Sequence, residues 1–167
     1  MFWWASFRKE KGAIKIHTLY DVKTSIPAFV HITEGNVHDV NTLDVLPYEA
    51  GGFCIKDKAY IDFIRLFVIH LSKAYFVTRA KDNFSFRRIS SLKIDKGNGI
   101  VCDQTIKLNG IKSSAKYPEV LRRIKYFYPE QQRAFLFITN NFTQHAIDIA
   151  LLYKYRWKVE LFFKWIK

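Results

Sequence analysis

The chain is poor in cysteine and holds few acidic residues. Two cysteines, Cys54 and Cys102, stand among 167 residues. They are too few for a disulfide framework and too unpatterned for a structural zinc site, so a reduced cytosolic protein is expected. No apolar run approaches the length of a membrane span, and the amino terminus lacks the layout of a signal peptide. No association with a membrane is therefore expected.

The shortage of acidic residues leaves a large positive charge. Fifteen Asp and Glu residues face 27 Lys and Arg residues, which gives a net charge of +12. The cations are spread along the chain, from Arg8 through Arg87 to Arg122, and do not form one basic tail. Dispersed positive charge favours a long polyanionic partner such as a nucleic acid backbone. A basic domain without such a partner is the alternative.

The apolar pattern predicts a folded domain with alternating strands and helices. Hydrophobic residues make up 49% of the chain and aromatic residues 17%, which excludes a disordered protein. Strand patterns occupy residues 13–22, 26–33, 53–55, 74–78 and 134–139, and helical patterns occupy 39–46, 61–71 and 143 to the end. Residues 81–133 hold shorter β-prone pieces, 99–103 and 104–108, with hairpin-type turn signals at 96–99 and Asn109-Gly110. We expect an α/β fold with a mixed sheet.

The last fifteen residues carry the pattern Y-x2-R-x3-E-x6-K. On one continuous helix, Tyr153, Arg156, Glu160 and Lys167 would share an arc of about 60°. A carboxylate can hold a divalent ion, while cations and a phenol can hold phosphates, so this face suits metal-assisted chemistry on a phosphate backbone. An amphipathic surface helix with pairs of opposite charges is the alternative.

A second candidate acid, Asp57, follows the apolar strand pattern at 53–55. Functional groups in α/β sheets commonly lie where a strand ends and a helix begins. An ordinary turn residue is the alternative for Asp57 taken alone. Asp57 and the helix-borne Glu160 could converge on one pair of metal ions if the residues between them loop outward.

Other conspicuous side chains are interpreted as structural. His17 and His38 have no metal-ligand spacing to a nearby Cys or His, so hydrogen-bonded structural histidines are predicted. Trp157 and Trp165 lie off the face that carries the terminal pattern, so packing is predicted for both in preference to base stacking.

Over essentially its whole length the chain resembles the DDE transposases of the insertion sequence four family. The terminal Y-R-E-K helix is the specific signature. The supporting stretches are K-G-A-I-K-I-H-T-L-Y-D at 11–21, H-I-T-E-G-N-V-H-D-V at 31–40, I-K-D-K-A-Y-I-D-F at 55–63, T-R-A-K-D-N at 78–83 and T-N-N-F at 139–142.

The resemblance implies a ribonuclease H-like mixed sheet with flanking helices. Residues 1–80 and 134–167 would form the catalytic core, and residues 81–133 would form a β-rich insertion subdomain. In that family three carboxylates hold two Mg²⁺ or Mn²⁺ ions; Asp57 matches the second Asp and Glu160 matches the Glu. Tyr153, Arg156 and Lys167 match the signature residues that contact DNA at the transposon end.

The resemblance also implies a reaction and its partners. The expected chemistry is metal-dependent phosphodiester cleavage followed by strand transfer. Double-stranded DNA, as transposon end and as target, would be the substrate. A homodimer is expected in the DNA complex, in the nucleoid of a bacterial cytoplasm.

The family's first catalytic Asp has no counterpart in this sequence. Asp21 and Asp39 match other segments, so neither takes that place. The expectation is an N-terminally truncated transposase that is inactive alone, because two carboxylates do not easily offset the repulsion between two dications. One alternative is a non-catalytic DNA-binding remnant or inhibitor of the full-length transposase. Another is a ribonuclease H-like nuclease that uses a different acid, such as Asp21.

Overall fold

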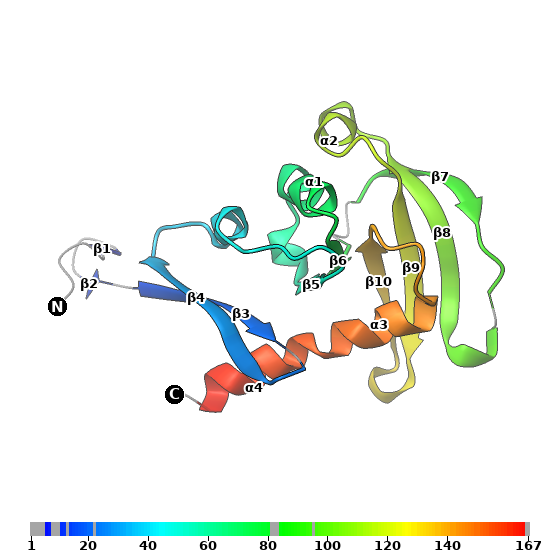
Figure 1. Cartoon of the computed structure of the whole chain (residues 1–167). Helices are drawn as coiled ribbons and strands as arrows, with labels where there is room; N and C mark the ends of the chain where they lie inside the picture. The colour runs from blue at the N-terminus through cyan, green and yellow to red at the C-terminus, as the bar shows by residue number, and fades with distance from the viewer. Residues whose placement is uncertain are drawn as a thin grey trace. The chain divides into compact units, whose positions relative to one another are not determined.

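A computed structural model describes residues 6–7, 11–12, 14–21, 23–80, 84–94 and 96–165. The chain divides into two compact units (Figure 1). The first unit comprises residues 1–47 and 157–167, and the second comprises residues 48–156.

The first unit is built on an antiparallel hairpin of strands β3 (Ile14–Asp21) and β4 (Ile26–Glu34). It also contains the short antiparallel pair β1 (Ser6–Phe7) and β2 (Lys11–Gly12), and the 3-10 helix η1 (Asp39–Asp44). The strand predicted at 13–22 is confirmed over Ile14–Asp21, and residues 13 and 22 lie outside the described residues. The strand predicted at 26–33 is confirmed, and the helix predicted at 39–46 is a 3-10 helix.

Two histidines of this unit make local hydrogen bonds. His17 is buried, and its Nε2 lies 2.9 Å from the hydroxyl oxygen of Thr33 on the paired strand. The Nδ1 of His38 accepts a hydrogen bond from the backbone N–H of Val40 and caps η1. The prediction of hydrogen-bonded structural histidines is therefore confirmed.

The second unit contains a six-stranded sheet with the order β5-β6-β10-β9-β8-β7. β5 and β6 are parallel and the other neighbours are antiparallel, so the sheet is mixed. The strands are β5 (Phe53–Lys56), β6 (Tyr75–Arg79), β7 (Phe86–Ser91), β8 (Ile100–Leu108), β9 (Leu121–Tyr128) and β10 (Arg133–Thr139).

Alternating apolar residues give this sheet a core on each face, because successive strand side chains point to opposite sides. Phe76 and Ile138 belong to one core cluster, with Leu66 of helix α1 (Phe63–Leu71). Their neighbours Val77 and Phe137 belong to the other cluster, which includes residues of helix α3 (Ala146–Lys154). Helices therefore flank both faces. The predicted α/β class with a mixed sheet is confirmed, and the arrangement is consistent with a ribonuclease H-like fold.

The segment 81–133 contributes β7, β8 and β9 to this sheet, together with helix α2 (Ile111–Lys116) and the 3-10 helices η3 (Lys96–Asn98) and η4 (Pro129–Gln131). The two strands predicted at 99–103 and 104–108 are one continuous strand, β8. The strands on either side of Asn109-Gly110, β8 and β9, are antiparallel neighbours as the turn signal predicts. Their connection is longer than a tight turn, because the Gly110 carbonyl accepts hydrogen bonds from Ser113 and Ser114 and α2 begins there. The division into a core and an insertion subdomain stays a prediction.

The continuous helix predicted from 143 onward is also wrong. The carboxamide oxygen of Asn141 accepts the backbone N–H groups of Thr143 and Gln144, so this segment is a turn and α3 begins at Ala146. A second interruption follows at Tyr155, and α4 runs from Arg156 to Trp165. In the described ranges, no helix is long and apolar enough to cross a membrane.

Candidate functional site

Asp57 lies directly after β5, at the carboxyl edge of the parallel pair β5–β6. Its backbone carbonyl accepts hydrogen bonds from the hydroxyl of Thr78, at 3.3 Å, and from the N–H of Tyr60, at 3.0 Å, in the 3-10 helix η2 (Lys58–Tyr60). Arg79 is the last residue of the neighbouring strand β6. The ends of parallel strands meet at one edge of a sheet, which is a common place for functional groups.

The carboxylate of Asp57 forms an ion pair with Arg156. One carboxylate oxygen lies 3.5 Å from a terminal guanidinium nitrogen, and both side chains are about one-third exposed. The same guanidinium lies over the ring of Tyr153, with its carbon 5.8 Å from the ring centroid. Asp57 therefore lies together with two predicted site residues from a distant part of the sequence, Tyr153 and Arg156, at this edge of the sheet.

Tyr153 anchors the cluster in the core. Only 8% of the side chain is exposed, and its ring packs on Phe137 with the centroids 5.0 Å apart. Burial raises the pKa of the phenol to about 12; the nearby Asp57 carboxylate also raises it, while Arg156 and Arg79 lower it. The hydroxyl is therefore protonated at neutral pH, and because its oxygen is buried, Tyr153 supports Arg156 from the core side.

A buried ion pair holds the segment before α3. The Nε and Nη2 atoms of Arg122 donate to the two carboxylate oxygens of Asp103 at 2.8 and 2.6 Å, and Nη1 donates to the carbonyl of Gln144 at 2.6 Å. The hydroxyl of Tyr128 donates to the carbonyl of Ala150 at 2.7 Å. These contacts fix α3, which carries Tyr153, against strands β8 and β9. No spacing in the sequence indicates them.

The other two predicted site residues belong to the first unit. Glu160 lies on α4 in the first unit, half-buried. Lys167 lies outside the described residues. The roles assigned to all five residues stay predictions.

Asp57 is the predicted metal ligand in the described cluster. Within the described ranges no group of three or more His, Cys, Asp or Glu side chains is placed to hold an ion. Asp57 offers one carboxylate, and a cation already engages it. Hard divalent cations take six or more oxygen ligands, with protein carboxylates supplying part of the set. Asp57 alone does not fit the two-ion site that the resemblance implies.

The carboxylate of Asp21 has a structural role in the β3–β4 turn. It accepts hydrogen bonds from the backbone N–H of Lys23 and from the hydroxyl of Thr24, both at 2.8 Å. The bond from Lys23 is the main reason why the pKa of this carboxyl is lowered. Such a contact stabilises a turn and explains the residue without a catalytic role.

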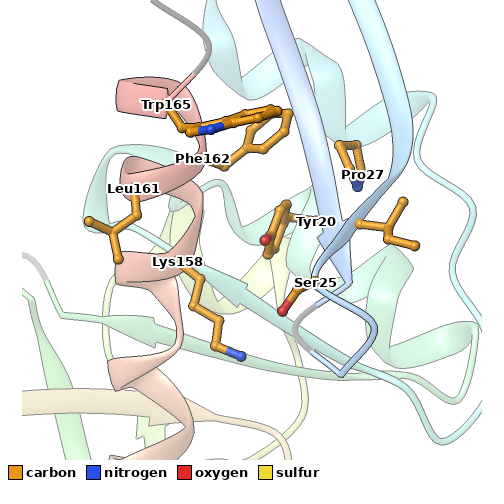
Figure 2. A pocket seen from close by; sticks show the side chains of 8 residues that line it. Tyr20, Ser25, Pro27, Lys158, Leu161, Phe162 and Trp165 are labelled. Carbon is orange, nitrogen blue, oxygen red and sulfur yellow. The ribbon is translucent and has the colours of Figure 1, made fainter.

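An apolar hollow of about 510 Å³ lies in the first unit, where α4 passes the β3–β4 hairpin (Figure 2). Tyr20 and Phe162 contribute rings with centroids 5.4 Å apart, and Lys158 is the charged residue in its lining. Trp165 also lines the hollow and is 82% exposed, while Trp157 is 51% exposed. The prediction that both tryptophans are packed is wrong, because more than half of each side chain is exposed.

Comparison with known proteins places the chain among transposases. The family model described as Transposase DDE domain matches residues 2–167. "Putative transposase y4zB" of Sinorhizobium fredii (strain NBRC 101917 / NGR234) is 34% identical over 168 residues, which cover 98% of this chain and 47% of that protein. "Probable transposase for insertion sequence element IS5377" of Geobacillus stearothermophilus is 31% identical over 166 residues, covering 98% of this chain and 43% of that protein.

The chain spans less than half the length of these two curated relatives. No solved structure matches it. Because the family match extends over nearly every residue, from Phe2 to Lys167, this chain belongs to the transposase DDE domain family.

Proposed function

We propose that this chain is the DNA-engaging part of a transposase of the insertion sequence four type, and that it binds double-stranded DNA without cleaving it on its own. The observation that carries the proposal is the meeting of Asp57, Tyr153 and Arg156 at the carboxyl edge of β5. The partly exposed guanidinium of Arg156, supported by the ring of Tyr153, is a donor suited to the oxygens of a phosphodiester. The net charge of +12 favours the same partner.

The absence of autonomous cleavage follows from the supply of acidic ligands. Transposases of this kind use divalent metal ions held by three carboxylates, and this sequence matches two of them, Asp57 and Glu160. In that arrangement the metal ions would activate the attacking oxygen and stabilise the leaving oxygen. The part that this chain contributes is to bind and orient the DNA strand beside Asp57. A homodimer on the DNA and an association with the nucleoid belong to the same proposal.

The experiment is a nicking assay on supercoiled plasmid with Mg²⁺ or Mn²⁺, which needs no knowledge of the transposon-end sequence. The purified chain should retard the plasmid in a gel and leave it supercoiled with either metal. If the chain nicks the plasmid and Asp57→Asn does not, then two matched carboxylates are enough for cleavage. That result would contradict the proposal that the chain does not cleave DNA on its own. Failure to retard DNA at low salt would overturn the whole proposal.

A further inference from the structure

A second basic site lies on strands β7 and β8, at the edge of the sheet opposite to β5 (Figure 1). The two strands are antiparallel, and their register places Arg87 directly across from Lys107. Opposed side chains in such a pair point to the same face of the sheet and start about 5 Å apart. Arg87 is exposed and Lys107 is half-buried. The pair therefore places two positive charges beside each other at the surface.

Two hydroxyl side chains lie beside this pair on the same face. The register shifts between Arg88 and Ser90, and beyond the shift Ser90 lies across from Thr105. Thr105 precedes Lys107 by two residues on β8, so their side chains point to the same face. We call Arg87, Ser90, Thr105 and Lys107 the ribbon site. It combines two cations with two hydroxyl groups, and all four can donate hydrogen bonds.

The positive charge of the ribbon site is not offset by an ion pair in the described part of the chain. Asp103 is the next residue on this face of β8, but it is 5% exposed and its two carboxylate oxygens accept hydrogen bonds from Arg122. Burial and the nearby Glu119 raise the pKa of the Tyr117 phenol, and Tyr117 packs in the core cluster on the other face of the sheet. Neither acid is therefore placed to neutralise the two cations.

Like charges directly across a strand pair destabilise the fold. A bound anion would relieve the repulsion, and the side chains of Arg, Lys, Ser and Thr all bind phosphate oxygens. We infer that the ribbon site binds the sugar-phosphate backbone of DNA. The site contains no ring and no carboxamide, so contact with phosphates is favoured over stacking on bases or reading of their edges. The inference rests on the proposed function, because it takes DNA as the partner.

The ribbon site is separate from the cluster at Asp57. Strands β6, β10 and β9 lie between β5 and β8. Neighbouring strands are about 4.8 Å apart, so roughly 19 Å separates β5 from β8 across the sheet. The two sites would therefore contact different phosphates, and a change in the ribbon site leaves the pair of Asp57 and Arg156 intact.

The test compares two double variants of the whole chain that lose the same charge. Arg87→Gln with Lys107→Gln removes both cations of the ribbon site. Arg88→Gln with Lys112→Gln removes two exposed cations outside it, because Arg88 lies across from Ile106 and points to the other face, and Lys112 lies on α2. Binding of a fluorescent duplex of arbitrary sequence is measured by anisotropy at a series of salt concentrations, without divalent metal. Circular dichroism and thermal unfolding confirm that each variant is folded.

Each phosphate contact contributes roughly 0.9 to the slope of log affinity against log salt, so the ribbon variant should lose about 1.8 in slope and the control variant much less. Equal losses in the two variants would overturn the ribbon site, because total charge alone would then control binding. No loss in the ribbon variant would overturn it as well. Both results would leave the proposed function standing, because the unmodified chain would still bind DNA. No binding by the unmodified chain would overturn both proposals.

A charge reversal separates DNA binding from folding. Lys107→Glu places a carboxylate across from Arg87, and opposite charges in this position stabilise a strand pair. The variant should have an unchanged or higher midpoint of thermal unfolding, and it should bind DNA about tenfold more weakly or worse at low salt. Unchanged DNA affinity would overturn the ribbon site. A lower midpoint would overturn it too, because the two cations would then not be held in repulsion.

Discussion

The carboxylate of Asp57 and the guanidinium of Arg156 lie 3.5 Å apart, at the end of a parallel strand pair and at the start of α4. Each side chain keeps about a third of its surface exposed, so both can exchange this partner for a ligand. An ion pair of this kind contributes little to stability in water. Under the proposed function, the pair keeps the cation positioned where a phosphate can reach it.

The first prediction concerns Asp57→Asn. Removing the negative charge should change the free energy of unfolding by less than about 1 kcal/mol, because a partly exposed ion pair is screened by solvent. Without divalent metal the variant should bind DNA several-fold more tightly, since no carboxylate then competes with phosphate for Arg156. Urea unfolding and DNA anisotropy in the presence of a chelator measure the two quantities. Weaker DNA binding by a folded variant would contradict this view of the pair.

The second prediction concerns the buried pair of Asp103 and Arg122, whose side chains are 6% and 5% exposed. Arg122→Met leaves the Asp103 carboxylate buried without its partner and should cost about 3–5 kcal/mol of unfolding free energy. Adding Asp103→Leu should restore a large part of that loss, because the unpaired charge is then gone. A double-mutant cycle by urea unfolding measures the coupling. Additive losses in the cycle would show that the two side chains do not act as a pair.

The third prediction concerns Lys56, which is buried and lies with its Nζ 5.9 Å from the centroid of the Tyr48 ring. Burial lowers its pKa from 10.5 to about 8. The folded chain therefore loses its proton more readily than the unfolded chain, and stability should rise as the pH increases from 8 toward 10.5. Below pH 8 the charged lysine should cost about 3 kcal/mol.

Lys56→Met is the matching variant, because it keeps the length of the side chain and removes the charge. It should be more stable than the unmodified chain at pH 7, and this advantage should shrink between pH 8 and pH 9.5. Urea unfolding of both proteins at each pH gives the difference and cancels the titration of other groups. A constant difference over this range would show that the amine of Lys56 is solvated in the folded protein.

The sequence predicts the strands better than it predicts the helix ends and the contacts between distant residues. Alternation at 26–33 identifies β4 because one face of a hairpin strand repeats every second residue. The helix ends are set by local bonds: Asn141 captures two backbone N–H groups and delays α3 to Ala146. Periodicity carries no information about such side-chain caps.

For the candidate site too, the sequence predicts individual residues better than it predicts the contacts between them. Asp57 is predictable as an acid after an apolar strand, and Arg156 as part of the terminal pattern, but their pairing depends on how α3 packs on the sheet.

The most direct test of the account is the DNA affinity of Arg156→Gln beside that of Lys154→Gln. Both variants lose one cation from neighbouring positions of the chain, but Lys154 is paired with Glu130 on the surface, whereas Arg156 is paired with Asp57. The account predicts a loss of about tenfold for Arg156→Gln, as expected for a charge-assisted hydrogen bond to phosphate, and little change for Lys154→Gln. Equal losses, or an unchanged affinity in Arg156→Gln, would contradict the claim that the Asp57, Tyr153 and Arg156 cluster engages DNA.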